Sequence, residues 1–249
     1  MNSLTTNVIY NKDAFMGMKD LPDKSIDLVV TDPPYLHVKG GMKSKVFNKA
    51  GTTWGSDSHM VNKMSDFDKE QIFEFLEIVL QKQKKANMYV FCSKLQLLHY
   101  FEFISEYNSK VPKSRVLKYD LLVWDKMNTS MKSSKFYTSD IEYVVRIYEA
   151  GVSLNKVWNE DSTKADSRFY TKRQAFKQPK GKHKTMKPTE LLERFILVAS
   201  EEGDVVLDPF MGSGSTAEAC LNTGRKYIGY EWDNEYIEVS SKRIEEITT

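Results

Sequence analysis

Short apolar runs recur along the chain, and most of them end at turn residues. Runs of this length, rich in Val, Ile and aromatic side chains, predict buried strands. The expected strands cover residues 26–30, 88–92, 121–124, 141–147, 205–207 and 227–229.

Helical periodicity fills several intervals between these runs. Residues 67–85 repeat apolar positions three and four apart, and Ser65 with Asp68 has the pattern of a capping box at the helix N-terminus. Pro188 suits the first turn of another helix. The further helices are expected at 94–107, 188–200, 215–223 and 234–246. Strands alternating with helices predict an α/β fold, a doubly wound, mostly parallel sheet with helices on both faces. Ligands of such sheets bind at the carboxyl ends of the strands.

Two long stretches follow neither pattern. Residues 37–65 are rich in Gly, Lys, Ser and Asn, and residues 150–185 are polar and basic with interspersed aromatic rings. Loops this long inside a compact domain are usually functional or disordered. We therefore expect a single domain over 1–249 with an inserted basic loop at 37–65 and a second basic segment at 150–185.

Charge is distributed unevenly along the chain. The formal net charge is +2, yet residues 164–187 hold nine Lys and Arg against one Asp, and residues 39–49 hold four Lys and no acid. The remainder is acidic. Such a distribution is suited to a polyanion that meets the two basic segments, although a solvated lysine-rich loop is the simpler alternative.

Composition excludes several classes of protein. A hydrophobic share of 41% suits a globular enzyme rather than a disordered chain. No apolar run approaches the roughly 18 residues of a membrane span, and the first ten residues lack the pattern of a secretory signal. Cys92 and Cys220 lie far apart, which does not resemble metal-ligand spacing and favours two buried thiols in a reducing compartment. We expect a cytoplasmic protein without a metal.

The first chemical motif is Asp32-Pro33-Pro34-Tyr35, directly after the first apolar run. Proline ends a strand and holds the preceding residue extended, so the segment presents one carboxylate, free carbonyl oxygens and an aromatic ring. Two acceptors can hold both hydrogens of an aryl amino group, free its lone pair and stabilise the positive charge that develops on alkylation. A base inside a duplex cannot reach such a pocket and must be flipped out. The alternative is a proline-rich turn with an incidental acid.

The second motif is Asp208-Pro209-Phe210-Met211-Gly212-Ser213-Gly214-Ser215-Thr216, between a short strand and a helix. Glycines let the backbone approach a ligand, and a helix N-terminus favours an anionic group. Glu231 ends the next strand, where ribose hydroxyls are bound in such folds. The spacing also satisfies a loose dinucleotide fingerprint, whereas an ATP-type phosphate loop is excluded because no Gly-Lys-Ser/Thr follows.

Together the two motifs resemble those of the DNA amino-methyltransferases, with the catalytic motif ahead of the cofactor motif as in the family's permuted β group. The segments 11–13, 21–27, 123–126 and 184–192 are similar to further parts of that group, so the likeness covers nearly the whole chain. The resemblance implies transfer of a methyl group from S-adenosylmethionine to the N6 amino group of adenine in DNA. It also implies that 150–185 is a small target-recognition segment, and it is compatible with a homodimer and with a stand-alone enzyme of restriction-modification type.

The residues expected to act fall into three groups. The catalytic residues are Asp32, Pro33, Pro34 and Tyr35. Those expected at the cofactor are Asp13, Thr185, Lys187, Asp208, Phe210, Gly212, Ser213, Gly214, Ser215, Thr216 and Glu231. Those expected on DNA are Lys39, Lys43, Lys45, Arg168, Lys172, Arg173, Lys177, Lys180 and Lys182. Lys187 can contact either the methionine carboxylate of the cofactor or a DNA phosphate. A direct role of His37 in the reaction, or stacking of Trp54 and Trp158 near a flipped base, is less favoured than ordinary packing.

Several alternatives stay open. Methylation of the N4 amino group of cytosine or of an RNA base needs the same acceptors. A nicotinamide oxidoreductase can use the glycine turn, but it leaves the Asp32 to Tyr35 motif without a purpose. A catalytically silent DNA-binding subunit is disfavoured because both motifs are intact.

Overall fold

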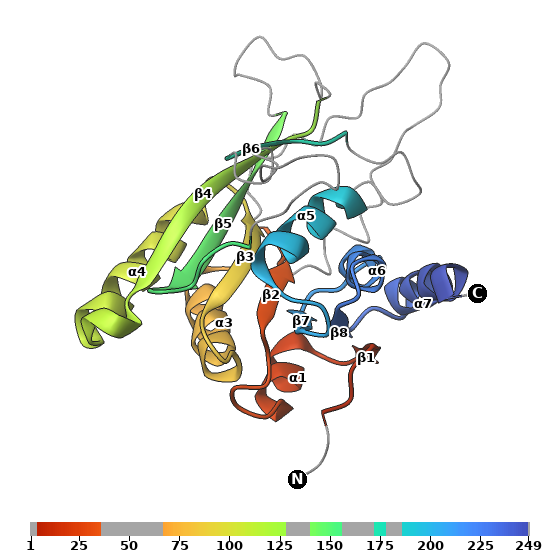
Figure 1. The fold of residues 1–249 in the computed structure, drawn as a ribbon, viewed down its shortest axis with the longest axis horizontal. Helices are drawn as coiled ribbons and strands as arrows, with labels where there is room; N and C mark the ends of the chain where they lie inside the picture. The colour runs from red at the N-terminus through yellow and green to blue at the C-terminus, as the bar shows by residue number, and fades with distance from the viewer. Residues whose placement is uncertain (1–3, 36–66, 128–139, 156–171, 178–185, 249) are drawn as a thin grey trace.

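The computed structural model describes residues 4–35, 67–127, 140–155, 172–177 and 186–248, and its centre is one eight-stranded sheet. The order across the sheet is β1-β8-β7-β2-β3-β5-β4-β6 (Figure 1). The strands are β1 (Val8–Asn11), β2 (Leu28–Thr31), β3 (Asn87–Cys92), β4 (Leu117–Asp125), β5 (Ile141–Glu149), β6 (Arg173–Ala175), β7 (Val205–Asp208) and β8 (Lys226–Glu231).

The sheet is parallel apart from β5, which pairs antiparallel with β3 on one side and with β4 on the other. The β1–β8, β7–β8, β2–β7, β2–β3 and β4–β6 pairs are all parallel. All strands except β5 therefore end at the same edge of the sheet, and β5 begins there.

Helices cover both faces, as the sequence predicts. One layer holds α1 (Ala14–Asp20), α3 (Lys69–Lys82) and α4 (Leu97–Lys110). The other holds α5 (Thr189–Ala199), α6 (Ser215–Asn222) and α7 (Asn234–Thr248). Figure 1 shows the two groups on opposite sides of the strands, and α1 packs on α3 and α3 on α4 in the first layer, α5 on α6 and α6 on α7 in the second.

Burial on both faces explains the continuous apolar runs. Along β2, Leu28 and Val30 belong to the core beneath α5 and α6, whereas Val29 between them belongs to the core beneath α1, α3 and α4. Each of these three side chains has none of its surface exposed. Burying an aliphatic side chain of this size stabilises the fold by roughly 1.5–3 kcal/mol. The expected α/β class and doubly wound architecture are confirmed.

Several local predictions need correction. The capping box at α3 is formed by Asp68, which is itself the N-cap, with Gln71, and Ser65 lies outside the described residues. Pro188 is the N-cap of α5 rather than a residue of its first turn. Four elements escaped the periodicity because they are short or weakly patterned: β1, α1, β6 and a 3-10 helix at Lys113–Arg115.

The expected basic loop 37–65 lies outside the described residues. Of the segment 150–185, the part that is described includes β6, which forms an edge of the sheet beside β4. The division into a catalytic domain, an insert and a recognition segment stays a prediction. None of the helices in the described ranges has the length and apolar character that a membrane span requires.

Candidate active site

The segments expected to carry chemistry follow four neighbouring strands. Asp13 comes after β1, Glu231 ends β8, the Asp208 motif comes after β7 and the Asp32 motif comes after β2. The register places Asn11 opposite Glu231, and the Asn11 and Glu231 ends of β1 and β8 therefore lie together. Segments separated by most of the chain thus meet at one edge of the sheet.

A buried hydrogen-bond chain joins the two motifs. Thr31 Oγ1 donates to Asp208 Oδ1 at 2.7 Å, and Thr216 Oγ1 donates to Asp208 Oδ2 at 2.6 Å. The backbone N–H of Phe210 also donates to Asp208 Oδ1 at 3.1 Å. Burial raises the pKa of Asp208 to about 6, against the opposing effect of these three donors. With its oxygens already engaged, Asp208 acts here by fixing the glycine loop relative to Thr31, the residue before Asp32.

Asp32 presents an unsatisfied acceptor at this edge. Its Oδ2 forms an ion pair with Lys187 Nζ, whereas Oδ1 is buried and has no hydrogen-bond partner among the described residues. The carbonyl oxygen of Pro33 likewise receives no hydrogen bond from any residue that the structure describes. Burial raises the pKa of Asp32, and the adjacent Lys187 ammonium opposes that rise. A buried acceptor without a donor is costly, so this pair of oxygens is suited to a ligand with N–H groups.

The loop that carries Asp32 is held in place from both sides. The carbonyl of Pro34 accepts from Gln96 Nε2 at 3.0 Å, and the same nitrogen donates to the Phe67 carbonyl at 3.0 Å. On the other side, the hydroxyl of Tyr35 donates to Glu142 Oε2 at 2.9 Å. Burial raises the pKa of Tyr35 well above its usual range, so the hydroxyl stays a donor. The ring of Tyr35 is therefore oriented before any ligand arrives.

Lys187 is bound between two carboxylates. Besides Asp32, its Nζ lies 3.2 Å from Glu142 Oε2, and Glu142 Oε1 lies 2.6 Å from Lys126 Nζ. Burial lowers the pKa of Lys187, but the two carboxylates outweigh it and hold that pKa above its usual value. Burial alone raises the pKa of Glu142, and the two ammonium groups reverse this and lower it. In the structure, Lys187 is paired with Asp32 and Glu142. Its contact with a cofactor carboxylate or with a DNA phosphate stays a prediction.

Three aromatic rings surround the same ammonium. Its Nζ lies 5.0 Å from the ring centroid of Phe91, 5.7 Å from that of Tyr35 and 5.9 Å from that of Trp124. Trp124 Nε1 donates to the Phe176 carbonyl at 2.9 Å, which fixes the indole. The neighbourhood of Asp32 therefore combines acceptors with flat apolar surfaces.

The glycine loop has room on one side and close packing on the other. Gly212 adopts φ +52°, its N–H donates to Glu231 Oε2 at 2.9 Å, and a Cβ built there meets nothing nearer than the Phe210 carbonyl at 3.9 Å. Gly214 adopts φ +82° as the N-cap of α6, where a Cβ falls 2.9 Å from Ser240 Cβ. The open side of Gly212, next to the carboxylate of Glu231, gives space in which a ligand can approach the backbone.

Arg243 of α7 anchors this loop. Its Nη1 donates to the Ser213 carbonyl at 3.2 Å and to Ser215 Oγ at 3.0 Å, while Nε forms an ion pair with Glu218. Phe210 packs edge-on against Phe67, with ring centroids 5.4 Å apart. The same Nη1 of Arg243 lies 3.5 Å from Ser213 Oγ, so both serine hydroxyls already have a partner.

The end nearest β1 carries polar and aromatic groups. Asp13 accepts from the Met16 N–H at 2.9 Å as the N-cap of α1, which gives it a structural role there. The Lys12 N–H donates to the Glu231 carbonyl at 3.0 Å, so Asp13 follows directly after a residue bonded to β8. Trp232, 57% exposed, comes immediately after Glu231 and offers a flat surface that the motifs do not indicate.

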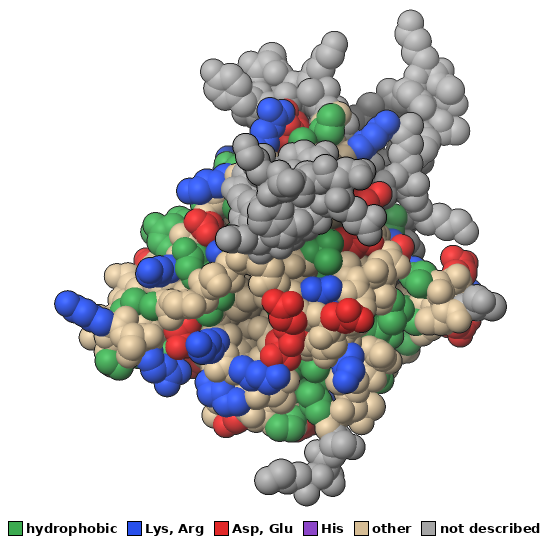
Figure 2. Space-filling view, in the orientation of Figure 1, with side chains coloured by type: hydrophobic (Ala, Val, Ile, Leu, Met, Phe, Trp, Pro, Cys, Tyr) green, Lys and Arg blue, Asp and Glu red, His purple; other side chains and the backbone are tan. Residues whose placement is uncertain are grey.

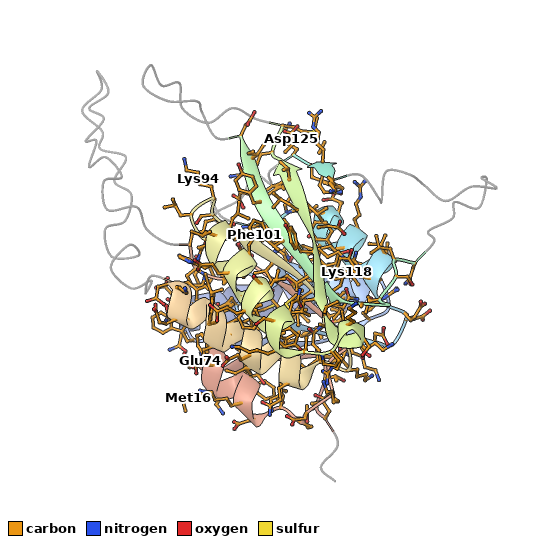
Figure 3. The ribbon with its side chains drawn as sticks, turned by 90° about the vertical axis from the view of Figure 1, so that its left-hand side faces the viewer. Met16, Glu74, Lys94, Phe101, Lys118 and Asp125 are labelled. Carbon is orange, nitrogen blue, oxygen red and sulfur yellow. The ribbon has the colours of Figure 1, made fainter. Side chains whose placement is uncertain are left out.

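The residues expected on DNA are only partly described. Lys172, Arg173 and Lys177 are exposed at β6, and Arg173 Nε lies 2.9 Å from Asp125 Oδ2, so its charge is partly neutralised. Val123, Asp125, Ile141, Lys172 and Arg173 line an open pocket of about 390 Å³. Figure 3 shows Asp125 and Lys94 toward the same end of the molecule, whereas Lys118 lies near the opposite end of β4. On the face shown in Figure 2, the described Lys and Arg side chains are interspersed with Asp and Glu.

The remaining predicted residues lie outside the described residues. They are His37, Lys39, Lys43, Lys45, Trp54, Trp158, Arg168, Lys180, Lys182 and Thr185. Cys92 and Cys220 are buried free thiols. In the part of the chain that is described, no group of three or more His, Cys, Asp and Glu side chains is placed to hold a metal ion.

Known proteins are similar to this chain in sequence and in fold. A family model described as DNA methylase matches residues 26–242. The Type II methyltransferase M2.DpnII of Streptococcus pneumoniae is 29% identical over 96% of this chain and 89% of its own length. The DNA adenine methyltransferase YhdJ of Escherichia coli (strain K12) is 27% identical over 95% of this chain and 82% of its own length.

Solved structures give the same result. The M1.HpyAVI–SAM complex superposes with a TM-score of 0.64 at 26% identity, covering 95% of this chain and 98% of the other. The PvuII DNA methyltransferase, described as cytosine-N4-specific, superposes with a TM-score of 0.65 over 96% of this chain and 86% of the other. Its identity is 17%, so it supports the fold alone.

Proposed function

This chain belongs to the DNA methylase family, and we propose that it transfers a methyl group from S-adenosylmethionine to the N6 amino group of adenine in DNA. The family match covers residues 26–242, which include both motifs. A relative aligned over 95% of this chain is a DNA adenine methyltransferase, and a structural neighbour was solved with the cofactor bound. The enzyme is thus a site-specific, adenine-specific DNA methyltransferase.

One observation carries the proposal. Asp32 has a buried oxygen without a donor, and the adjacent Pro33 carbonyl also lacks one among the described residues. Thr31, one residue earlier, is hydrogen-bonded to the aspartate that fixes the glycine loop. An acceptor pair for an amino group and a loop for the methyl donor are therefore coupled through a single buried carboxylate.

The mechanism follows from these acceptors. Asp32 and the Pro33 carbonyl hold the two hydrogens of the amino group, which draws the nitrogen toward tetrahedral geometry and frees its lone pair. The nitrogen would gain positive charge as its lone pair forms the bond to the methyl carbon while the carbon–sulfur bond of the donor breaks, and the Asp32 carboxylate stabilises that charge. One amino hydrogen then leaves as a proton to water. The base must leave the duplex to reach these groups, and the oriented ring of Tyr35 supplies a surface on which it stacks.

The residues present suit the proposed cofactor. S-adenosylmethionine supplies a methyl group activated by a sulfonium centre. Gly212 leaves open space beside the loop, and Glu231 places a carboxylate next to it that suits ribose hydroxyls. Gly214 and Arg243 hold the loop in shape, and Trp232 offers a flat surface for an adenine ring. Positioning by these groups supplies much of the rate.

DNA is the expected partner. Lys172 and Lys177 are exposed on either side of β6, and neither is part of the ion pair between Arg173 and Asp125, so both can meet phosphates without breaking it. Activity in the cytoplasm is consistent with two buried free thiols. A homodimer stays a prediction, which light scattering of the purified protein tests directly.

Sequencing of DNA from producing cells tests the proposal. The protein is expressed in cells that lack DNA methylation, and their genomic DNA is read by a single-molecule, modification-sensitive method. We expect N6-methyladenine within a recurring short sequence. N4-methylcytosine instead keeps the mechanism and corrects the base, since the family also includes enzymes of that kind.

Asp32→Ala is the decisive variant. Turnover should be lost while calorimetry still detects binding of S-adenosylmethionine, because Asp32 acts on the amino group. Asp20→Ala, which removes a carboxylate whose side chain is 70% exposed, is the matched control and should retain activity. Full methylation by Asp32→Ala overturns the catalytic assignment, and a wild-type protein that modifies no base overturns the proposed function.

A further inference from the structure

Lys187 is paired with one oxygen of Asp32, the carboxylate that holds the amino group in the proposed reaction, and the other oxygen, Oδ1, has no partner among the described residues. Its Nζ is paired with Asp32 Oδ2, it is surrounded by the three aromatic rings described above, and only 7% of the residue is exposed. An ammonium carries the same kind of N–H donors as an amino group. In the structure, therefore, a side chain of the protein itself occupies one acceptor of the catalytic carboxylate.

A lysine that remained there would oppose the reaction in two ways. It would leave the amino group only Oδ1 of the two oxygens of Asp32. Its full positive charge would also lie close to a nitrogen that becomes positive as the methyl group is transferred, and like charges at short range in a buried site repel strongly.

Glu142 provides a second partner within reach of the same ammonium. Its Oε2 lies 3.2 Å from Lys187 Nζ, so Lys187 can keep a charged partner after a small change of its side-chain torsions. Glu142 is itself held by the Tyr35 hydroxyl and by Lys126, and its side chain is 17% exposed. A buried cation needs such a partner, because burying it unpaired is costly.

We propose that Glu142 is a positioning residue for methyl transfer, which takes over the Lys187 ammonium when the amino group of the base binds Asp32. Lys187 then stays close enough to keep Asp32 ionised without blocking it. The inference rests on the proposed function, since it assigns a role in that same reaction.

Two neutralising substitutions have opposite effects on Asp32. Lys187 lowers the pKa of Asp32, so Lys187→Met should shift the acid limb of the pH–rate profile to higher pH. Glu142 raises the pKa of Asp32, so Glu142→Gln should shift the acid limb to lower pH. The charged and titratable groups that interact with Asp32 from the packed elements are Lys187, Glu142, Tyr35, Asp208, Cys92 and Tyr100, and Lys126 is paired with Glu142.

The plateau of the profile carries the second part of the inference. With Gln at position 142, Lys187 has a single carboxylate partner and stays on Asp32 Oδ2, so its full positive charge remains beside the nitrogen that becomes positive. We expect the single-turnover rate of Glu142→Gln above the acid limb to fall roughly ten-fold, which corresponds to about 1.4 kcal/mol. Its affinity for S-adenosylmethionine should be unchanged, because Glu142 is bonded to Tyr35, Lys126 and Lys187 rather than to the glycine loop.

The experiment measures single-turnover methyl transfer from labelled cofactor to unmethylated genomic DNA across mildly acidic to mildly alkaline pH. Lys187→Arg keeps the cation and should leave the acid limb in place. Glu149→Gln makes the same chemical change at the opposite end of β5 and should behave as wild type. Thermal melts followed by circular dichroism establish which variants fold, and Glu142→Gln decides the question if Lys187→Met does not.

A direct titration removes the dependence on turnover. Carbon-13 NMR of protein labelled at the aspartate carboxyl groups, without DNA or cofactor, follows Asp32, whose resonance is assigned by its loss in Asp32→Asn. The Asp32 midpoint should move up in Lys187→Met and down in Glu142→Gln. Midpoints and acid limbs that do not move, or that move in the same direction, overturn the inference while wild-type methylation still supports the proposed function. If the wild type methylates no DNA, the proposed function fails and the NMR titration alone decides the charge coupling.

Discussion

Gly214→Ala should destabilise the protein by about 2–5 kcal/mol, because two separate costs meet at this residue. The backbone adopts φ +82°, which costs an L side chain about 1–2 kcal/mol. The new Cβ would also lie 2.9 Å from Ser240 Cβ and 3.2 Å from Ser240 Cα, on an α7 residue with none of its surface exposed. Relief of that overlap requires α7 to shift, and overpacking of this kind costs about 1–3 kcal/mol.

Gly203→Ala is the matched control. Its φ is +85°, and a Cβ there meets nothing within 4 Å, so only the backbone cost of about 1–2 kcal/mol should appear. Urea unfolding gives both free energies, and their difference isolates the overlap with Ser240. Combining Gly214→Ala with Ser240→Gly removes the overlapping Cβ and should recover part of the loss.

The loop geometry also affects ligand binding. Because Gly214 ends the turn that begins at Gly212, calorimetry should show weaker binding of S-adenosylmethionine to Gly214→Ala and unchanged binding to Gly203→Ala. Equal destabilisation by both alanines, or the absence of any recovery in the double variant, would refute the steric argument.

Three further predictions concern the same edge of the sheet and the basic segment. The pKa of Asp208 is raised from 3.8 to about 6, so the folded state holds the proton of this carboxyl more tightly than the unfolded state does. The free energy of unfolding should therefore fall by on the order of 3 kcal/mol as pH rises from about 4 to about 6. Urea unfolding of Asp208→Asn should show a weaker dependence of this free energy on pH, and an unchanged dependence contradicts the assignment. Arg243→Met removes charge-assisted bonds to Ser213 and Ser215, so cofactor affinity should fall about ten-fold by calorimetry, whereas unchanged affinity contradicts its anchoring role. Joint replacement of three basic residues should lower the slope of log affinity for DNA against log salt by up to about 2.7, and an unchanged slope shows that this segment does not meet phosphates. These three residues are Lys177, Lys180 and Lys182.

The location of the site could be predicted from the sequence because it depends on a general property of parallel sheets. The Asp32 and Asp208 motifs each follow an apolar run, and parallel strands place the residues that follow them at one edge. The structure adds that β2 and β7 are neighbours and that Thr31 is hydrogen-bonded to Asp208. The hydrophobic pattern does not predict this hydrogen bond, because the bond depends on which strands pair rather than on where the strands lie along the chain.

Other elements could not be predicted because their local signals are weak or ambiguous. β6 consists of Arg173, Gln174 and Ala175 and has no apolar pattern that would predict a strand. It is a strand because its backbone pairs with that of β4. The start of α3 offered two polar residues as caps, and only the structure shows that Asp68 bonds the Gln71 N–H.

Glu142 shows most clearly where local reasoning ends. It stands within the apolar run 141–147, where an acid normally indicates the solvent side of a half-exposed strand. Because β5 is antiparallel to its neighbours, the beginning of this strand lies where the other strands end, and Glu142 therefore faces the site. Its burial is compatible with a charge only because Lys187 and Lys126 arrive from other elements. In a mixed sheet, then, an acid at the start of an antiparallel strand belongs among the candidate site residues as much as an acid at the end of a parallel one.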